Sequence, residues 1–250
     1  MQGESGFGGI LDLVRDLRVR CEFDRAFTLD TLRPYLREEL AEFEEAQDAG
    51  DESKMAAELG DILLHCAFQL VLAEERGAWD LAGVSDRLIT KMKARHPHLY
   101  AGGERQDWEK QKAEERRRHA AELGQPMSIL GHLPPALPEL ERAFRLQERA
   151  AAVGFDWPDL EGPLDKLEEE VAETREDPAG EIGDVLFAAV NVARKAGIHP
   201  SIALREATDK FVRRFEQIEA LAVERKIDVA TAGLEALDVL WDEVKEGESR

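Results

Sequence analysis

Residues 181–191 have the sequence EIGDVLFAAVN, and residues 58–64, ELGDILL, repeat its beginning almost unchanged. Each stretch follows a Glu-Glu-x-x-Glu sequence, at residues 169–173 and at residues 38–42. Because residues three apart on a helix lie on the same face, each copy directs pairs of acids from two successive helices toward one place. The repetition indicates that these acids belong to a structural unit that was copied whole.

Four carboxylates gathered beside core residues repel one another unless a cation neutralises them. In the second copy they lie on a polar helix face with apolar residues on both flanks, which is typical of a bundle that lines an interior site. Oxygen ligands favour a hard ion, and Mg²⁺ suits best because it binds carboxylates together with substrate phosphates; Mn²⁺ is an expected substitute. The predicted ligands are Glu170, Glu173, Glu181 and Asp184, and a second, weaker set is Glu39, Glu42, Glu58 and Asp61.

Simpler explanations exist for several of these residues. A single Glu-x-x-Glu in an acidic chain is more often a solvated helix face than a ligand pair, so the metal prediction depends on the repetition and on the apolar flanks. His65, four residues after Asp61, is expected to pack in the bundle rather than to bind metal. The His-Pro-His sequence at residues 96–98 is expected to end a helix, and Trp79 and Trp108 are expected to pack.

Composition limits the classes of protein to which the chain can belong. Its 250 residues, 43% hydrophobic and 34% charged, suit helices with one buried face, and the repeat favours two domains. The net charge of −20 argues against nucleic acid or an anionic membrane as partner, because both need a basic surface. Cys21 and Cys66 lack metal-type spacing and are expected to be free thiols. Without a signal sequence or a run of about 18 apolar residues, the predicted location is the cytoplasm.

Helical periodicity runs along the chain, and no convincing strand pattern interrupts it. The predicted fold class is all-α, with two tandem helical-bundle domains at residues 1–122 and 138–250 and a Pro- and Gly-rich linker at residues 123–137. Ser201 is a candidate N-cap. Helices are predicted near residues 9–19, 31–49, 53–76, 80–95, 106–122, 139–152, 162–176, 179–196, 200–224 and 233–245.

Further motifs point to a substrate that carries phosphates. Lys210, Arg213 and Arg214 share one predicted helix; alone they would more often be surface charge, but beside an acid-metal centre they suit phosphate oxygens. Three further motifs are VGFDW at residues 153–157, KFVRRF at residues 210–215 and RHPH at residues 95–98. On these and the acid motifs, the chain resembles the MazG family of nucleoside triphosphate pyrophosphohydrolases in its two-domain form. The resemblance implies an all-α homodimer that uses Mg²⁺ to hydrolyse NTP or dNTP to the monophosphate and pyrophosphate, with nucleotide-pool cleansing as a candidate role.

Carried onto this sequence, the resemblance also implies roles for single residues. Glu170, Glu173, Glu181 and Asp184 would bind the metal. Glu169, Glu170 and Lys210 would take part in catalysis, with Glu169 as the candidate proton acceptor. With two polar-face residues of the second copy included, the nucleotide-binding set would be Lys166, Glu169, Asn191, Lys195, Lys210, Arg213, Arg214 and Trp241.

The first copy keeps the acids, but at the aligned positions of the cations it keeps only Lys91 and Arg95. Tyr35 stands at the position of Lys166, Leu72 at that of Lys195, and Ala94 at that of Arg213. Residues 21–24, Cys-Glu-Phe-Asp, also depart from the Cys-Pro-Trp-Asp that is common in the family. Hydrolysis is therefore expected chiefly in the second half. Two alternatives stay open: a pyrophosphohydrolase of narrower specificity, such as one for dCTP, dUTP or phosphoribosyl-ATP, and a nucleotide-sensing or scaffold protein that binds metal and triphosphate without turnover.

Overall fold

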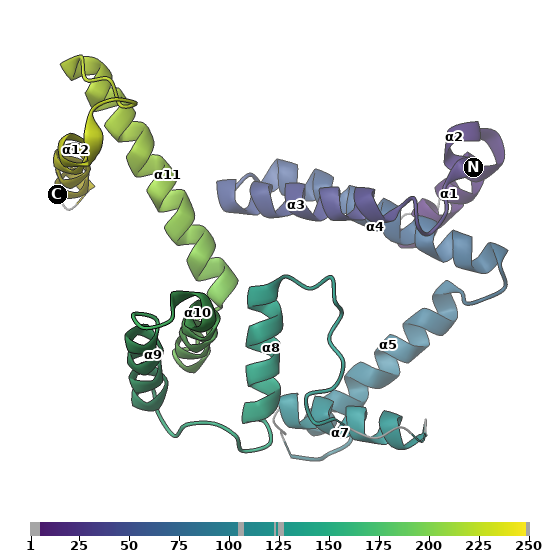
Figure 1. The fold of residues 1–250 in the computed structure, drawn as a ribbon. Helices are drawn as coiled ribbons and strands as arrows, with labels where there is room; N and C mark the ends of the chain where they lie inside the picture. The colour runs from purple at the N-terminus through teal and green to yellow at the C-terminus, as the bar shows by residue number, and fades with distance from the viewer. Residues whose placement is uncertain (1–5, 105–107, 123, 125–127, 249–250) are drawn as a thin grey trace. The chain divides into compact units, whose positions relative to one another are not determined.

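The computed structural model describes residues 6–104, 108–122, 124 and 128–248, and in this part of the chain all the regular secondary structure is helical (Figure 1). The predicted all-α fold class is confirmed. The chain forms two compact units, residues 1–105 and 106–250. The helix at Trp108–Glu122 therefore belongs to the second unit, whereas the sequence analysis assigns it to the first. The physical reason is that this helix packs against the helix that follows it.

The first unit is built around one long helix. Its helices are α1 (Phe7–Arg20), α2 (Glu22–Ala26), α3 (Arg33–Ala49), α4 (Glu52–Glu75), α5 (Leu81–Arg95) and α6 (Pro97–Tyr100). Helix α4 packs against both α1 and α3. The turn between α3 and α4 is sharp because Gly50 adopts a left-handed conformation (φ 66°) and the Asp51 carboxylate accepts hydrogen bonds from the first backbone amides of α4. This turn brings the acid-bearing segments of α3 and α4 side by side.

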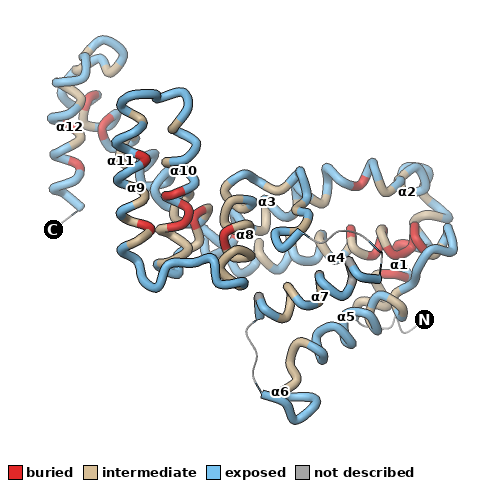
Figure 2. Tube along the Cα trace, turned by 60° about the horizontal axis from the view of Figure 1, so that its bottom comes forward, coloured by how far each residue is buried: buried red, intermediate tan, exposed pale blue. Residues whose placement is uncertain are grey.

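The core of the first unit lies where α1 crosses α4, and Figure 2 shows the buried positions on these helices. Its buried residues include Leu11, Val14, Leu32 and Phe68, and the ring of Phe27 packs edge-on against Phe68. Among the described helices, α4 alone is long and apolar enough to span a bilayer by length and composition, with a mean hydropathy of 1.5. A core helix can pass the same test; α4 packs against both α1 and α3, and 39% of its apolar window is buried.

The second unit contains two helical hairpins and two further helices. Its helices are α7 (Trp108–Glu122), α8 (Glu139–Ala151), α9 (Glu161–Glu173), α10 (Pro178–Lys195), α11 (Pro200–Arg225) and α12 (Gly233–Glu248). Helices α9 and α10 form one hairpin, and α8 packs against α10, α11 and α7. The second hairpin pairs α12 with α11 through a small core of Ile218, Ala222, Leu240 and Val244.

Each predicted helix is present, with ends that differ by a few residues. The structure adds two short helices, α2 and α6, that periodicity over a longer window does not detect. Pro97 does end helix α5 as predicted, and it then opens α6. The prediction of Ser201 as an N-cap is wrong: the cap is His199, because Pro200 occupies the first helical position, where its missing N–H costs nothing.

Candidate functional site

The second acid set converges at the α9–α10 hairpin. One carboxylate oxygen from each of Glu170, Glu173 and Glu181 lies within 4.8 Å of the other two. The connection is short, and Asp177 caps α10 by accepting a hydrogen bond from the Gly180 amide at 3.2 Å. Glu170 is buried, Glu181 is half-buried and Glu173 is exposed, so the trio spans the boundary between core and solvent.

A cation of the chain itself already binds to this cluster. The Lys166 ammonium lies 2.7 Å from a Glu170 oxygen and 2.8 Å from a Glu169 oxygen. Hydrogen bonds to Glu169 and then to Glu170 raise the pKa of Lys166. Lys166 and Glu169 thus lie beside the predicted metal ligands, with the ammonium at the edge of the cluster, and their contact with a nucleotide stays a prediction.

Glu181 is the acid of this cluster whose pKa is raised. Burial raises the pKa of its carboxyl group, and the charges of Glu173, Asp184 and Glu170 raise it further, in that order. Asp184 therefore acts on the cluster electrostatically, although it is not one of the three whose oxygens meet within 4.8 Å. A divalent cation fits these residues, because oxygen donors converge on one place and repel one another.

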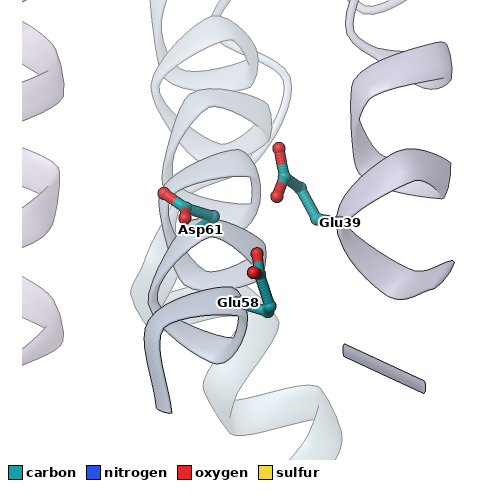
Figure 3. A group of neighbouring side chains, drawn as sticks. All are labelled: Glu39, Glu58 and Asp61. Atoms are coloured by element: carbon teal, nitrogen blue, oxygen red, sulfur yellow. The ribbon is translucent and has the colours of Figure 1, made fainter. Parts of the chain in front are cut away.

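The first acid set forms a similar cluster in the other unit. Figure 3 shows Glu39 on α3 directed toward Glu58 and Asp61 on α4, and one oxygen of each lies within 4.8 Å of the others. Burial raises the pKa of Glu58, as do the charges of Glu42 and Glu39, while Lys54 lowers it. Glu42 thus influences the cluster without belonging to the closest trio.

Two residues predicted to bind nucleotide, Asn191 and Lys195, have partners within their own unit. The Asn191 Oδ1 atom accepts a hydrogen bond from the Arg194 Nε at 2.9 Å, and Lys195 donates to the Asp156 carboxylate at 3.2 Å and to the Trp157 carbonyl. Arg194 also binds Asp156. Burial would raise the pKa of Asp156, but the bonds from Arg194 and Lys195 outweigh it and lower that pKa. Lys195 and Arg194 therefore hold the loop at residues 154–158, Asn191 accepts a hydrogen bond from Arg194, and the contact of Asn191 and Lys195 with a nucleotide stays a prediction.

One cation of α11, Arg214, binds a carboxylate of α12. The Arg214 guanidinium binds the Glu248 carboxylate at 2.6 and 3.0 Å and lies 5.5 Å from the centroid of the Trp241 ring. The bond from Arg214 lowers the pKa of Glu248, with smaller contributions from the charges of Arg213 and Lys210. Arg214 and Trp241 are therefore brought together, and Arg214 binds an anionic group, while Lys210 and Arg213 act on that carboxylate through their charges alone.

Sequence reasoning missed Asp156, Arg194, Gly162 and Glu248. The VGFDW motif contains Asp156, but spacing alone does not show that its partners lie on α10. Gly162 touches the ring of Trp157: a Cβ atom there would lie 1.9 Å from Trp157 Cδ1. Beside this loop, between α8 and α10, lies an apolar cavity of about 450 Å³ that is lined in part by Trp157 and Asn191.

Comparison with known proteins identifies the family. A sequence profile described as the MazG nucleotide pyrophosphohydrolase domain matches residues 27–100. A Thermotoga maritima protein named nucleoside triphosphate pyrophosphohydrolase/pyrophosphatase MazG is 40% identical over 236 residues, which cover 91% of this chain and 90% of that protein. This chain belongs to the MazG family. The Escherichia coli K12 nucleoside triphosphate pyrophosphohydrolase is 34% identical over 256 residues, 96% of this chain and 95% of the relative.

The MazG profile covers the first acid set, while the two full-length relatives extend over both sets. The family resemblance stated from the motifs is therefore confirmed. In each unit the acids lie on a pair of packed helices: α3 with α4, and α9 with α10.

Proposed function

We propose that this MazG protein hydrolyses nucleoside triphosphates, NTP or dNTP, to the nucleoside monophosphate and pyrophosphate in a Mg²⁺-dependent reaction. The observation that carries the proposal is the convergence of Glu170, Glu173 and Glu181 within 4.8 Å, with Lys166 bound at the edge of the cluster. The names of the two full-length relatives support the same reaction. Removal of deleterious nucleotides from the cytoplasmic pool is the role that we propose for it.

Glu170, Glu173, Glu181 and Asp184 would hold the metal ion, with Mn²⁺ as a substitute for Mg²⁺. Bound there, the ion would offset phosphate charge and make a water molecule more nucleophilic. Side chains of the protein would bind the phosphates and accept a proton. The Lys166 ammonium, which lies beside Glu170 and Glu169, would bind a phosphate oxygen of the substrate. Glu169, exposed beside the cluster, could then accept the proton of the attacking water.

Lys210, Arg213 and Arg214 would bind the charged phosphates of the substrate and stabilise the leaving pyrophosphate. Support comes from the anion that Arg214 already binds: the Glu248 carboxylate offers the same paired oxygen acceptors as a phosphate. The Trp241 ring beneath the guanidinium would hold it in position or stack on a base. In the first copy Tyr35, Leu72 and Ala94 stand at the aligned positions of cations, so we propose that the second copy is the hydrolytic one.

We also propose that the protein acts as a homodimer. The two acid helices carry the same exposed apolar face: Leu59 and Leu63 of α4 are 47% and 37% exposed, and the aligned Ile182 and Leu186 of α10 are 52% and 57% exposed. Leucine and isoleucine repeated on one exposed helix face favour a helix of a second chain as their cover. With a net charge of −20, neither nucleic acid nor an anionic membrane is a proposed partner.

A panel of NTPs and dNTPs tests the proposed reaction. Release of pyrophosphate should need Mg²⁺ and stop when EDTA is added. A panel that yields pyrophosphate from a single nucleotide would favour the narrower pyrophosphohydrolase. Binding of metal and triphosphate with no release from any nucleotide would instead establish the sensing or scaffold function.

A further inference from the structure

One of the cations proposed to bind phosphate already has an anionic partner within the chain. The Nε and Nη2 atoms of Arg214 on α11 both donate to a single oxygen, Oε2 of Glu248 on α12, at 3.0 and 2.6 Å. The contact is partly shielded from water, because only 19% of the Arg214 side chain and 36% of the Glu248 side chain are exposed. Glu248 thus uses the two N–H groups with which a guanidinium would also bind a phosphate group.

Arg214 is held from a second side by aromatic rings. Its guanidinium carbon lies 5.5 Å from the centroid of the Trp241 ring, and the Trp241 ring lies 5.5 Å from that of Phe211. Such a contact favours one placement of the guanidinium and leaves its N–H groups for an anion. The placement of Arg214 therefore does not depend on Glu248 alone, and the guanidinium can exchange one anion for another.

The neighbouring cations act on the same carboxylate. The hydrogen bond from Arg214 lowers the pKa of Glu248 most, and burial opposes it, while the charges of Arg214, Arg213 and Lys210 lower this pKa further. The carboxylate therefore lies in the positive field that is proposed to hold the phosphates of a nucleotide. A phosphate group that binds Arg214 must displace Glu248, because two anions at the same donors repel each other.

We propose that Glu248 competes with the substrate: its carboxylate occupies Arg214 until a phosphate group of a nucleoside triphosphate replaces it. The inference rests on the proposed function, in which Arg214 binds phosphate. Glu248 would lower the affinity for the nucleotide and take no part in the chemical step. The exchange would keep the guanidinium paired at each stage, with the carboxylate first and with phosphate afterwards.

A second ion pair between the same helices provides the matched control. Arg225 of α11 binds Glu243 of α12 at 2.6 and 2.7 Å. Arg225 lies eleven residues after Arg214, which is about 16 Å along the helix. Loss of the Glu243 pair would therefore loosen α12 from α11 without releasing a cation that is proposed to bind phosphate.

The test measures binding of the α,β-methylene analogue of ATP, which cannot be cleaved between its α and β phosphorus atoms, to the full-length chain with Mg²⁺ by calorimetry. We expect Glu248→Gln to bind the analogue about two- to fivefold more tightly than the parent, since a partly exposed ion pair has an effect of about this size. Glu248→Ala should show the same gain, and Glu243→Gln should bind like the parent. With ATP as substrate, Glu248→Gln should lower KM by a similar factor and leave kcat undiminished.

An affinity of both Glu248 variants equal to or below that of the parent would overturn the proposal. The same gain in Glu243→Gln would also overturn it, because loosening of α12 would then explain the effect. Arg214→Gln separates this inference from its premise: it should weaken binding of the analogue, and unchanged binding would refute both the phosphate-binding role of Arg214 and the competition. The expected binding pattern without any release of pyrophosphate from ATP would support the competition and refute the proposed hydrolysis of ATP.

Discussion

The pKa of the Glu181 carboxyl group responds to the other acids of the second copy. Burial and the charges of Glu173, Asp184, Glu170 and Asp177 all raise the pKa of Glu181 and favour its protonated form. A bound divalent ion has the opposite effect, because it stabilises the ionised form of every carboxylate that it contacts. If these acids bind the metal as we propose, they should lower the stability of the metal-free protein and provide the affinity for the ion.

Changing Glu181→Gln should separate these two effects. The amide removes one negative charge with little change of shape, so the metal-free protein should unfold at a higher temperature than the parent. Its affinity for Mg²⁺ should fall by at least about tenfold, the loss typical of disturbing a ligand shell. Calorimetry would measure both quantities, with exposed Glu176→Gln as control. An unchanged Mg²⁺ affinity would show that Glu181 is not a ligand.

Gly162 tests the packing of the loop that Asp156 anchors. A methyl group at this position would lie 1.9 Å from Trp157 Cδ1, so the indole ring must move. We expect Gly162→Ala to lower the free energy of unfolding by about 1–3 kcal/mol, as overpacking does. Gly247→Ala is the control, since a Cβ there meets nothing within 4 Å. Chemical denaturation followed by tryptophan fluorescence measures both, and equal stabilities would refute the contact.

At the scale of the helices, the α9–α10 hairpin should respond to Mg²⁺ in a pH-dependent way. The folded-state pKa of Glu181 lies above its ordinary 4.5, so the folded chain holds that proton more tightly than the unfolded chain. Without metal, stability should therefore fall as the pH rises through the raised pKa. Mg²⁺ binds the ionised form, so its stabilising effect should grow with rising pH.

The measurement is the unfolding temperature with Mg²⁺ and with EDTA, at about pH 5 and about pH 7.5, where carboxylates differ in ionisation. We expect the Mg²⁺-induced increase to be clearly larger at the higher pH. A double variant, Glu58→Gln with Glu181→Gln, should lose most of this difference, since both carboxyl groups have raised pKa values. An increase independent of pH would place the ion elsewhere.

The sequence predicted helices well because apolar periodicity decides them locally. The acids of α3, α4, α9 and α10 could likewise be found, since i, i+3 spacing fixes a face and repetition excludes chance. The hydrogen-bond and ion-pair partners that depend on tertiary contact could not be found from the sequence. Nothing in the spacing of Glu248 indicates that it binds Arg214, and nothing near Asp156 indicates that α10 supplies its cations. The unit boundary also depends on a tertiary contact, that of α7 with α8.

At the scale of the whole molecule, the repeated apolar face of α4 and α10 should hold two chains together. A charge placed in it would be costly to bury, so Leu186→Asp should shift the protein toward monomer. Val239→Asp on α12 is the control, because Val239 is also exposed but does not belong to the repeated face. Sedimentation velocity measures both. A parent chain that is monomeric and fully active at assay concentration would exclude the dimer.

The two copies should also contribute unequally to the reaction of the whole molecule. Both gather carboxylates, but only the second has Lys166 at its acids and the cations Lys210, Arg213 and Arg214 in the same unit. Two charge-assisted contacts at about 1.5–3 kcal/mol each correspond to roughly two to four orders of magnitude in rate. Acids without these partners can bind an ion and still fail to cleave a triphosphate.

The most direct test of this account compares pyrophosphate release by Glu42→Gln and Glu173→Gln, made separately in the full-length chain with saturating Mg²⁺. These residues occupy aligned positions in the two copies. We predict that Glu173→Gln lowers the rate by about two orders of magnitude or more, while Glu42→Gln stays within about threefold of the parent. Equal losses from the two changes, or a larger loss from Glu42→Gln, would contradict the assignment of hydrolysis to the second copy.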